Sequence, residues 1–544
     1  MPTTDSTYTL PEDLSSKVHA RIDALREQNI VRRVWERDPS VWSNGDENRW
    51  LGWLRLPMQD PDAVALTVEF ASGITAEGMT DVVLLGMGGS SLAPEVMREI
   101  IGRAEGYPAL HVIDSTDPRQ ILSVERAIDF RTTMFLVASK SGTTLEVNIL
   151  KEHFFHRAVQ ELGAEQAGRH FVLTTDPGSK LEQIAQHEGF RAIFPGLPTV
   201  GGRYSALSNF GLVPAAMLGA DPVLLLDRAR DMAQRCALPG AENPGLELGA
   251  VLGELALSGR DKPTLIAPRG VASFGAWLEQ LVAESLGKQG KGIIPIEGEA
   301  AGAPDSYGSD RIFVHLRYAG APDAEGDAAV EQLQRAGHPV LRIEWADRYA
   351  LGAEFYRWEF ATAIAGAVLG VNPFDQPDVE AAKIVTRRLA EEYETTGVLS
   401  DDEPPLTEKD VRALLDQLRD GDYFAILAFI EMSEEHRNAL DSIRGLVRDR
   451  RKVATTVGFG PRYLHSTGQA HKGGPGSGVF LVITCDDPED LPVPGHRYSF
   501  GTIKRLQARG DHEVLASRGR RVLRVHLKDV DAGLRDLRAI VAAL

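Results

Sequence analysis

Short apolar runs that end in Gly-, Ser- and Thr-rich turns dominate the chain from Asp81 onward. They recur at intervals of about 25 to 40 residues, each followed by an amphipathic segment, which is typical of strand–loop–helix units in a parallel sheet. The first runs are DVVLLGMGGSS, LHVIDSTDP, MFLVASKSGTT and HFVLTTDPGS. A second set follows at PTLIAP, KGIIPIEG, DRIFVHLRY and HPVLRIEW, which predicts a second sheet domain. Ligands are expected at the carboxyl ends of such strands.

The pattern differs on both sides of these runs. Residues 1–78 show helical spacing and polar breaks, and residues 378–450 also look helical, broken by SDDEPP near 400. The tail alternates again, with GVFLVITCDD and RVLRVHL as strands. We therefore predict an α/β fold with two parallel-sheet sandwich domains. Its parts are a helical N-terminal segment (1–78), a first sheet domain (79–235), a second (236–377), and a helical and mixed C-terminal segment that packs on them (378–544).

Composition excludes several classes of protein. Of 544 residues, 43% are hydrophobic and 25% are charged, as in ordinary globular proteins. The start MPTTDSTYTLPEDL lacks the pattern of a signal peptide, and no apolar stretch approaches the ~18 residues of a membrane helix. The two cysteines, Cys236 and Cys485, lie far apart without His or Cys at ligand spacing. We expect a cytoplasmic protein with no metal site, no disulfide framework and no membrane partner.

Charge narrows the choice of ligand. The net charge of −18 argues against a nucleic-acid-binding surface, which needs clustered Lys and Arg. An anionic substrate must then be captured by local backbone N–H groups, hydroxyls and a few cations.

The turn VASKSGTTLEVN offers such groups. A strand ends at Ser139 and a helix begins near Thr143, so Ser139, Ser141, Thr143 and Thr144 converge on free N–H groups at the start of the helix. Helix capping alone explains one or two of these hydroxyls. Four in six positions favour a phosphate cradle, to which Lys140 could add charge.

The turn LLGMGGSSLAPEV also suits a ligand, but not a nucleotide. Gly86, Gly88 and Gly89 allow close backbone approach, and Ser90 and Ser91 open the next helix. The last Gly of G-x-G-x-x-G is missing, and so is the GK[ST] ending of a P-loop. A sugar-sized phosphate ligand is therefore preferred.

Several motifs together resemble the glucose-6-phosphate isomerase family, whose fold is a pair of sugar-isomerase (SIS) domains. They are SKSGTTLE, VGGRYSALS (200–208), ESLGKQG (284–290) and GVNPFDQPDVEAAK (370–383), and they span Gly86 to Lys383. A further segment, YLHSTGQAHKGGP (463–475), resembles the isomerase half of transaldolase/isomerase fusions.

The resemblance implies reversible isomerisation of glucose 6-phosphate and fructose 6-phosphate in glycolysis and gluconeogenesis, without a cofactor. Glu284 lies where the family has its catalytic base, which moves a proton between C2 and C1 through a cis-enediol, and Gln280 lies one helical turn before it. Arg203 matches the arginine that stabilises the enediolate. The remaining sugar and phosphate contacts are expected at Gly89, Ser90, Ser139, Ser141 and Thr144. The alternatives are a solvated surface charge for Glu284 and a structural ion pair for Arg203.

The chain departs from the family at two positions. The family uses a histidine to open the sugar ring, and His338 in EQLQRAGHPVLRIEW has the expected topological place, although a turn residue is as good an interpretation. The family's C-terminal lysine corresponds to Lys472, in a glycine-rich segment where His471 competes with His338 for ring opening. If the family pattern holds, the histidine comes from a partner subunit, so a homodimer is expected.

Other functions are weighed against this one. A fused transaldolase needs a β/α barrel of ~250 residues, which 78 residues cannot hold. A glutamine-dependent aminosugar synthase needs an N-terminal cysteine, and the first cysteine here is Cys236. A non-catalytic sugar-phosphate-binding SIS protein could share the fold, but it has no use for both Glu284 and Arg203. An isomerase that also accepts mannose 6-phosphate stays open.

Overall fold

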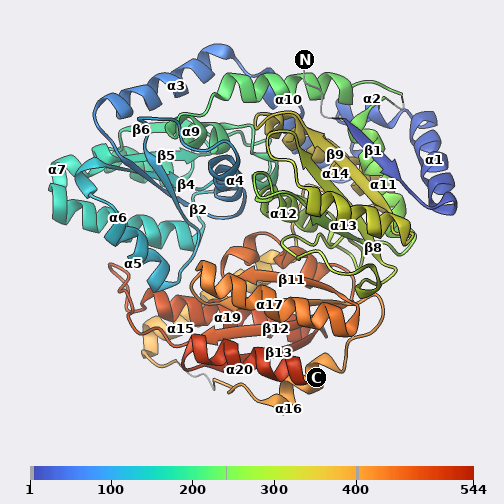
Figure 1. Ribbon diagram of the computed structural model, residues 1–544. Coiled ribbons are helices and arrows are strands. Elements are labelled where there is room, and N and C mark those ends of the chain that lie inside the picture. Colours follow the sequence, from blue (N-terminus) through green and yellow to red (C-terminus); the bar gives the residue numbers. More distant parts are fainter. Residues whose placement is uncertain (1–4, 241, 400–402) are drawn as a thin grey trace.

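Three sheets of mainly parallel strands, each flanked by helices, make up the molecule (Figure 1). The structure is a computed structural model, and it describes residues 5–240, 242–399 and 403–544. The first two sheets lie side by side, and the third, in orange and red, packs beneath both. The α/β fold with parallel-sheet domains predicted from the sequence is confirmed.

The first sheet has five parallel strands in the order β3-β2-β4-β5-β6. Because helices cover both faces, the central strands are mostly apolar, and β4 is buried at every position. The strands are β2 (Asp81–Gly86), β3 (Ala109–Ile113), β4 (Thr133–Ala138), β5 (Phe171–Thr175) and β6 (Ala192–Pro195). The helices are α4 (Leu92–Ile100), α5 (Pro118–Ala127), α6 (Leu145–Leu162), α7 (Ala164–Ala167), α8 (Lys180–His187) and α9 (Asn209–Met217).

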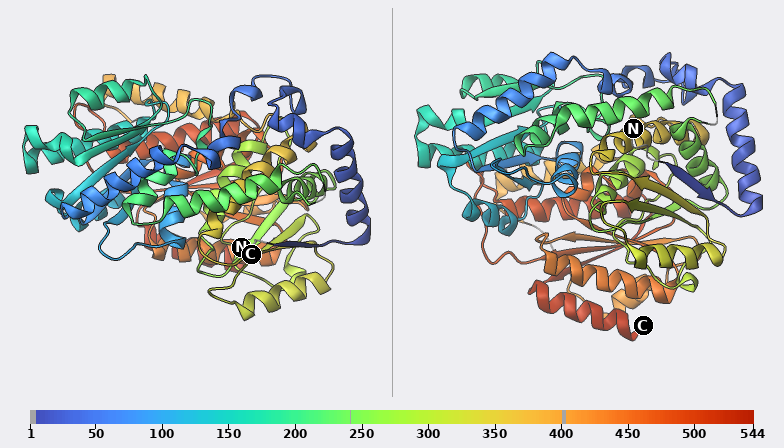
Figure 2. Two further views of the ribbon diagram at one scale, coloured as in Figure 1. Left: turned by 90° about the horizontal axis from the view of Figure 1, so that it is seen from above. Right: turned by 45° about the horizontal axis from the view of Figure 1, so that its top comes forward.

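The second sheet has the order β1-β9-β8-β7, with β1 antiparallel to β9 and the other strands parallel (Figure 2). Its strands are β7 (Lys262–Ile266), β8 (Arg311–Tyr318), β9 (Val340–Trp345) and β1 (Ser6–Thr9). The helices are α10 (Pro222–Cys236), α11 (Pro244–Leu257), α12 (Phe274–Leu286), α13 (Ala324–Arg335) and α14 (Ala350–Leu369).

Two expectations for this sheet need correction. The run KGIIPIEG is not a strand: it makes only isolated bridges, Ile296 with Thr264 and Lys291 with Lys288. Pro295 interrupts the apolar run and has no N–H to donate. The N-terminal segment is not wholly helical, since β1 lies in it. This strand is only four residues long and pairs with residues more than 300 positions away, so the local sequence pattern does not reveal the strand. The other N-terminal elements include α1 (Glu12–Glu27), α2 (Ile30–Trp35) and α3 (Pro61–Ala76).

The third sheet is formed by the C-terminal part of the chain. Its strands are parallel in the order β11-β10-β12-β13: β10 (Tyr423–Phe429), β11 (Ala454–Phe459), β12 (Gly478–Cys485) and β13 (Arg521–Leu527). The helices are α15 (Val379–Thr396), α16 (Glu408–Leu415), α17 (Glu434–Arg451), α18 (Gly468–Gly473), α19 (Phe500–Ser517) and α20 (Val530–Ala543). None of the helices in the described ranges is long and apolar enough to cross a membrane.

The helical expectation for residues 378–450 fails at β10. Its sequence YFAILAF is apolar at every position and buried on both faces, so it carries no period that separates a strand from a buried helix. The SDDEPP break falls partly outside the described residues. The domain boundaries predicted at 78, 235 and 377 stay a prediction.

Candidate active site

Glu284 lies in the last turn of α12 and faces other polar groups, not open solvent. Only 13% of its side chain is exposed, and its Oε1 lies 3.4 Å from Nη1 of Arg203. Gln280, one turn earlier, donates its amide to Oε2 at 3.0 Å. A carboxylate that is largely buried beside a guanidinium is not a solvated surface charge.

Arg203 is fixed on every side of its guanidinium. It lies in a short 3-10 helix (Gly202–Tyr204) and is 2% exposed. Its Nε donates to Oγ of Ser285 at 2.7 Å, and its Nη2 donates to the carbonyl oxygens of Pro373 and Asp375 at 2.8 and 2.9 Å. These acceptors are neutral, so they fix the guanidinium without neutralising its positive charge. The charged group that contacts it is Glu284.

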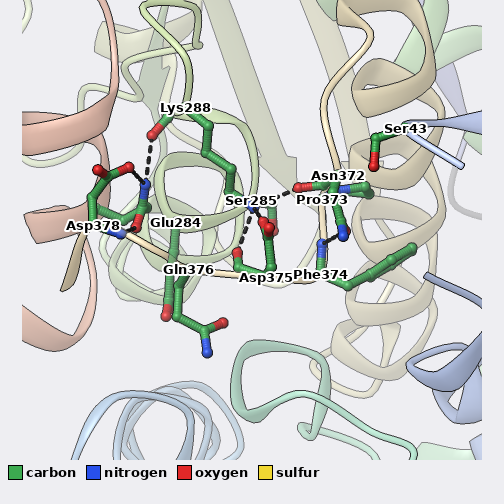
Figure 3. Close-up of polar contacts among 12 residues, drawn as sticks. Ser43, Glu284, Ser285, Lys288, Asn372, Pro373, Phe374, Asp375, Gln376 and Asp378 are labelled. Carbon is green, nitrogen blue, oxygen red and sulfur yellow. Dashed lines mark hydrogen bonds and ion pairs between the residues drawn. The ribbon is translucent and has the colours of Figure 1, made fainter. Parts of the chain in front are cut away.

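The NPFDQPD segment (372–378) is the clamp on this arginine. Figure 3 shows this segment beside Glu284 and Lys288. Gln376 accepts from Nη1 of Arg203 at 2.9 Å and lies alongside Glu284 in the close-up. Lys288 holds the same segment: its ammonium donates to the carbonyl of Asn372 at 2.5 Å and to the carboxylate of Asp375 at 2.6 Å. Burial, with a smaller effect from Arg203, lowers the pKa of Lys288 to about 7. The motif ESLGKQG contained Lys288, but no role was predicted for it.

The predicted phosphate cradle lies where β4 ends and α6 begins. Ser139 is buried, with its hydroxyl 3.4 Å from that of Thr144, and the hydroxyls of Ser141 and Thr143 lie 2.9 Å apart. Thr144 is the N-cap of α6, yet its side chain makes no capping hydrogen bond. Within the described chain, the N-cap residue thus supplies no side-chain bond to the first N–H groups of this 18-residue helix. Lys140, in contrast, is paired with Asp176.

The glycine turn after β2 packs against the backbone that carries Arg203. A Cβ atom on Gly89 would lie 1.9 Å from the carbonyl oxygen of Gly202, so only glycine allows these two backbones to meet. Ser90 follows in the same turn and is buried. Gly88 has a φ of +56°, and a Cβ there would meet the carbonyl oxygen of His465 at 2.8 Å and the amide nitrogen of Gln280 at 2.9 Å.

His465 and Glu146 belong to the same neighbourhood and were not predicted as site residues. The backbone carbonyl of His465 accepts from the Gln280 amide at 2.8 Å, and its ring Nε2 lies 3.1 Å from Oε1 of Glu146. Glu146 is in the first turn of α6 and also accepts from the amide of Gln507 at 2.7 Å. The sequence signal was present in SKSGTTLE and YLHSTGQAHKGGP, but spacing could not show that these segments meet.

The other two predicted histidines lie in different surroundings. His338 contacts the carbonyl of Pro304 at 3.2 Å and the rings of Tyr307 and Phe313. His471 is 2% exposed, bonds Tyr423 at 3.0 Å, and packs on Phe480. Burial lowers the pKa of both histidines. No contact found for either ring, within the described residues, reaches Glu284 or the cradle.

Lys472 is on the short helix α18 and not in an open loop. Its ammonium is buried and paired with Asp511 on α19, which also accepts from the hydroxyl of Tyr463 at 2.6 Å. Its predicted part in catalysis stays a prediction.

Two features outside this site could hold ligands. A cavity of about 340 Å³ opens at the carboxyl ends of β8 and β9, lined by residues such as Arg317, Asp323 and Trp345, and it includes none of the site residues above. Glu403, Asp486 and His526 place ligand atoms within 4.8 Å of one another beside the third sheet. Neither feature bears on the chemistry at Glu284.

Comparisons with known proteins point to sugar-phosphate isomerases. A family model described as phosphoglucose isomerase matches residues 65–299. A glucose-6-phosphate isomerase of Rubrobacter xylanophilus is 32% identical over 385 residues, which are 62% of this chain and 88% of that protein. A glucose-6-phosphate isomerase of Thermosynechococcus vestitus is 30% identical over 455 residues, 72% and 85% of the two chains.

Solved structures share the fold. A hypothetical protein from Thermus thermophilus superposes with a TM-score of 0.61 at 26% identity, covering 70% of this chain and 99% of that one. A glucose-6-phosphate isomerase from Chlamydia trachomatis gives a TM-score of 0.59 at 20% identity, covering 71% and 88%, a likeness of fold alone.

Proposed function

Because the chain belongs to the glucose-6-phosphate isomerase family, we propose that it interconverts glucose 6-phosphate and fructose 6-phosphate with Glu284 as the base. The observation that carries the proposal is the contact of a largely buried Glu284 with a fully clamped Arg203, next to an uncapped helix start lined with hydroxyls. A sugar-phosphate sensor has no need of this pair.

Glu284 acts on the two carbons that exchange a proton. In the open-chain aldose, the carboxylate takes the proton from C2 while the carbonyl oxygen at C1 becomes an enediolate oxygen. The proton of the C2 hydroxyl passes to O1, and the same carboxylic acid returns a proton to C1 as the C2 carbonyl forms, which leaves the ketose. Gln280 orients the carboxylate through its hydrogen bond to Oε2.

Arg203 favours the transition state over the ground state. Negative charge develops on the enediolate oxygens during proton transfer, and a guanidinium that is already fixed needs no reorganisation when that charge appears. The four partners of its N–H groups, on Ser285 and in the segment 373–376, fix its plane.

The cradle holds the 6-phosphate and so places C1 and C2 beside Glu284. Ser139, Ser141, Thr143 and Thr144 supply hydroxyls, and the first turn of α6 supplies backbone N–H groups and the positive end of a helix dipole. Gly89 and Ser90 contact the sugar. Lys140 contributes only if it leaves Asp176.

Two finer points belong to the same proposal. We place the enzyme in the cytoplasm and expect a homodimer, as the family resemblance implies. Acceptance of mannose 6-phosphate is a second candidate activity, because C2 epimers differ only in how one hydroxyl is received.

The experiment compares Glu284→Gln with the wild-type chain and with Glu247→Gln, a control in α11 outside the site. Purified proteins are mixed with glucose, fructose or mannose 6-phosphate without added metal or cofactor. Turnover by Glu284→Gln is expected to fall by about 10² or more, while Glu247→Gln stays near the wild-type rate. If the wild-type protein interconverts no pair, it is not an isomerase; if Glu284→Gln stays active, Glu284 is not the base.

A further inference from the structure

We propose that Lys288 is a positioning residue for Arg203: it holds the segment 372–378 so that the guanidinium faces the charge that develops beside Glu284. The inference rests on the proposed isomerase function and adds to it a residue that acts through another side chain. Lys288 lies two residues after the end of α12 at Leu286, and its side chain is 2% exposed.

The first argument is the turn that carries Lys288. Its backbone N–H donates to the carbonyl of Lys291 at 2.9 Å, and the N–H of Lys291 donates back at the same distance. The two residues between them, Gln289 and Gly290, have positive φ angles of 56° and 74°, so they form a tight two-residue turn. The base of the Lys288 side chain is therefore fixed at the end of the helix that carries Glu284.

The second argument is that Lys288 and Arg203 bind the same short stretch of chain. The ammonium donates to the carbonyl of Asn372 at 2.5 Å, and Arg203 donates to the next carbonyl, that of Pro373, at 2.8 Å. The carbonyl oxygen of Asp375 accepts from both cations, and it lies 2.9 Å from Nη2 of Arg203. Because one oxygen serves both cations, a shift of this carbonyl away from Lys288 also changes its bond to Arg203.

The third argument is the distribution of charge. Burial and the charge of Arg203 lower the pKa of Lys288, and the carboxylates of Asp375 and Glu284 act in the opposite direction. An ammonium has three N–H donors, and the three acceptors on Asn372 and Asp375 use all of them. Lys288 thus occupies the carboxylate of Asp375, whose main chain already binds Arg203, and keeps this carboxylate from neutralising the guanidinium.

The far end of the segment is held separately, by α18 and α19. The backbone N–H of Asp378 donates to Oε1 of Gln469 at 2.9 Å, and Nε2 of Gln469 donates to the Asp378 carboxylate at 2.6 Å. Arg518 on α19 is paired with the same carboxylate. Loss of Lys288 should therefore displace residues 372–375 while the segment stays attached to the third sheet.

The consequence for the reaction follows from when Arg203 is needed. Negative charge appears on the enediolate oxygens only during proton transfer, so a displaced guanidinium costs rate more than it costs affinity for the uncharged end of the substrate. The phosphate is bound elsewhere, at the start of α6. A defect at Lys288 should therefore appear in kcat and not in KM.

The first test is the kinetic effect of removing the ammonium. Lys288→Met takes away the three donors and keeps the length of the side chain. We expect kcat for glucose 6-phosphate to fall by about 10², with KM changed less than about threefold. Lys291→Met is the matched control, since this lysine lies in the same turn but donates to the carbonyl of Leu369 at 2.8 Å, and it should keep wild-type kinetics. Wild-type kinetics in Lys288→Met would overturn the proposal.

The second test asks whether Lys288 acts through Arg203. Arg203→Gln alone should lower kcat by about 10³. If the lysine only positions the arginine, Lys288→Met added to Arg203→Gln should lower kcat by less than about threefold more. A further loss of about 10² in the double variant would show that the two residues act independently, which contradicts the proposal.

The third test separates positioning from general support of the fold. A five-carbon aldonic acid 5-phosphate carries a carboxylate where the enediolate would form, whereas glucitol 6-phosphate carries only hydroxyl groups there. In calorimetry, Lys288→Met should weaken binding of the acid by about 30-fold and binding of glucitol 6-phosphate by less than about threefold. Equal weakening of both analogues would mean that Lys288 only supports the fold.

Asp375→Asn covers the case in which Lys288→Met does not fold. The Asp375 side chain is 45% exposed, so an amide is tolerated there, but the buried ammonium loses its charged partner. We expect kcat to fall by about tenfold, with the same selective weakening of the acid analogue. Wild-type turnover and wild-type binding of both analogues in this variant would contradict the proposal.

The outcomes also distinguish this inference from the isomerase proposal. If the wild-type chain interconverts no sugar phosphate but binds the acid analogue in a way that depends on Lys288, the isomerase proposal fails and the positioning role stands. If the wild-type chain is an isomerase and Lys288→Met matches it in kcat and in binding of both analogues, the positioning role fails and the isomerase proposal stands.

Discussion

At the carboxyl edges of the first and second sheets, strands lead into helices in the same way, but the side chains differ: hydroxyls line the first edge and carboxylates line the second. After β4, the turn carries serine and threonine hydroxyls, and α6 begins without a side-chain cap. After β8, Asp323 caps α13 by accepting from Gly326 at 3.0 Å, and Asp327 and Glu344 line the neighbouring cavity. Burial lowers the pKa of His315 there to about 4, so this ring adds no positive charge at neutral pH.

The difference shows that the fold offers a place for a ligand and the side chains decide which ligand is accepted. Parallel strands bring helix starts to both edges. At the first edge, the N-cap side chain of α6 makes no bond to the first N–H groups of the helix, which favours an anion there. At the second edge, a carboxylate caps α13, and the acidic side chains lining the cavity outnumber the basic ones. We therefore expect a phosphate to bind at the first edge and to be repelled from the second.

Thr144→Asp converts the first edge into a copy of the second and should have the largest effect on binding. Its carboxylate would cap α6 and occupy the phosphate position, so KM for glucose 6-phosphate should rise by about 100-fold. The helix cap should at the same time keep or raise the free energy of unfolding. Steady-state kinetics and urea unfolding measure the two effects, and an unchanged KM would show that phosphate does not bind there.

Ser139→Ala removes one buried hydroxyl from the cradle without adding charge. We expect KM to rise by about tenfold with kcat largely retained, the loss of one hydrogen bond to a charged group. Thr132→Ala, at a position before β4 and away from the cradle, is the control. A fall in kcat without a change in KM would move Ser139 from phosphate binding to the chemistry.

Asp323→Ala should have the smallest effect, because it removes a cap from the edge that binds no substrate. The free energy of unfolding should fall by about 1 kcal/mol, and KM and kcat should stay at wild-type values. Urea unfolding with assays on the same samples tests this. Any rise in KM above a few-fold would connect the second edge to the substrate.

The sequence predicts the first edge better than the second and third. The hydroxyl turn at 139–144 can be recognised from its own residues, whereas the roles predicted for Arg203 and Glu284 come from motifs that resemble a family. In the structure Arg203 contacts Glu284, and His465 connects Gln280 to the first turn of α6. The strand β10 and the contact between His465 and Glu146 could not be predicted from the sequence. An all-apolar run has no readable period, and a contact between residues 319 positions apart depends on how the third sheet packs.

Exchange of the C2 hydrogen tests the central claim most directly. Glucose 6-phosphate with deuterium at C2 is incubated with wild-type, Glu284→Gln and Thr144→Asp chains, and loss of the label is followed by NMR. At saturating substrate we predict rapid loss with the wild-type chain, loss slowed by about 10² or more with Glu284→Gln, and a near-normal rate with Thr144→Asp. Label loss at the wild-type rate in Glu284→Gln would contradict the account, because the proton would then leave C2 without this carboxylate.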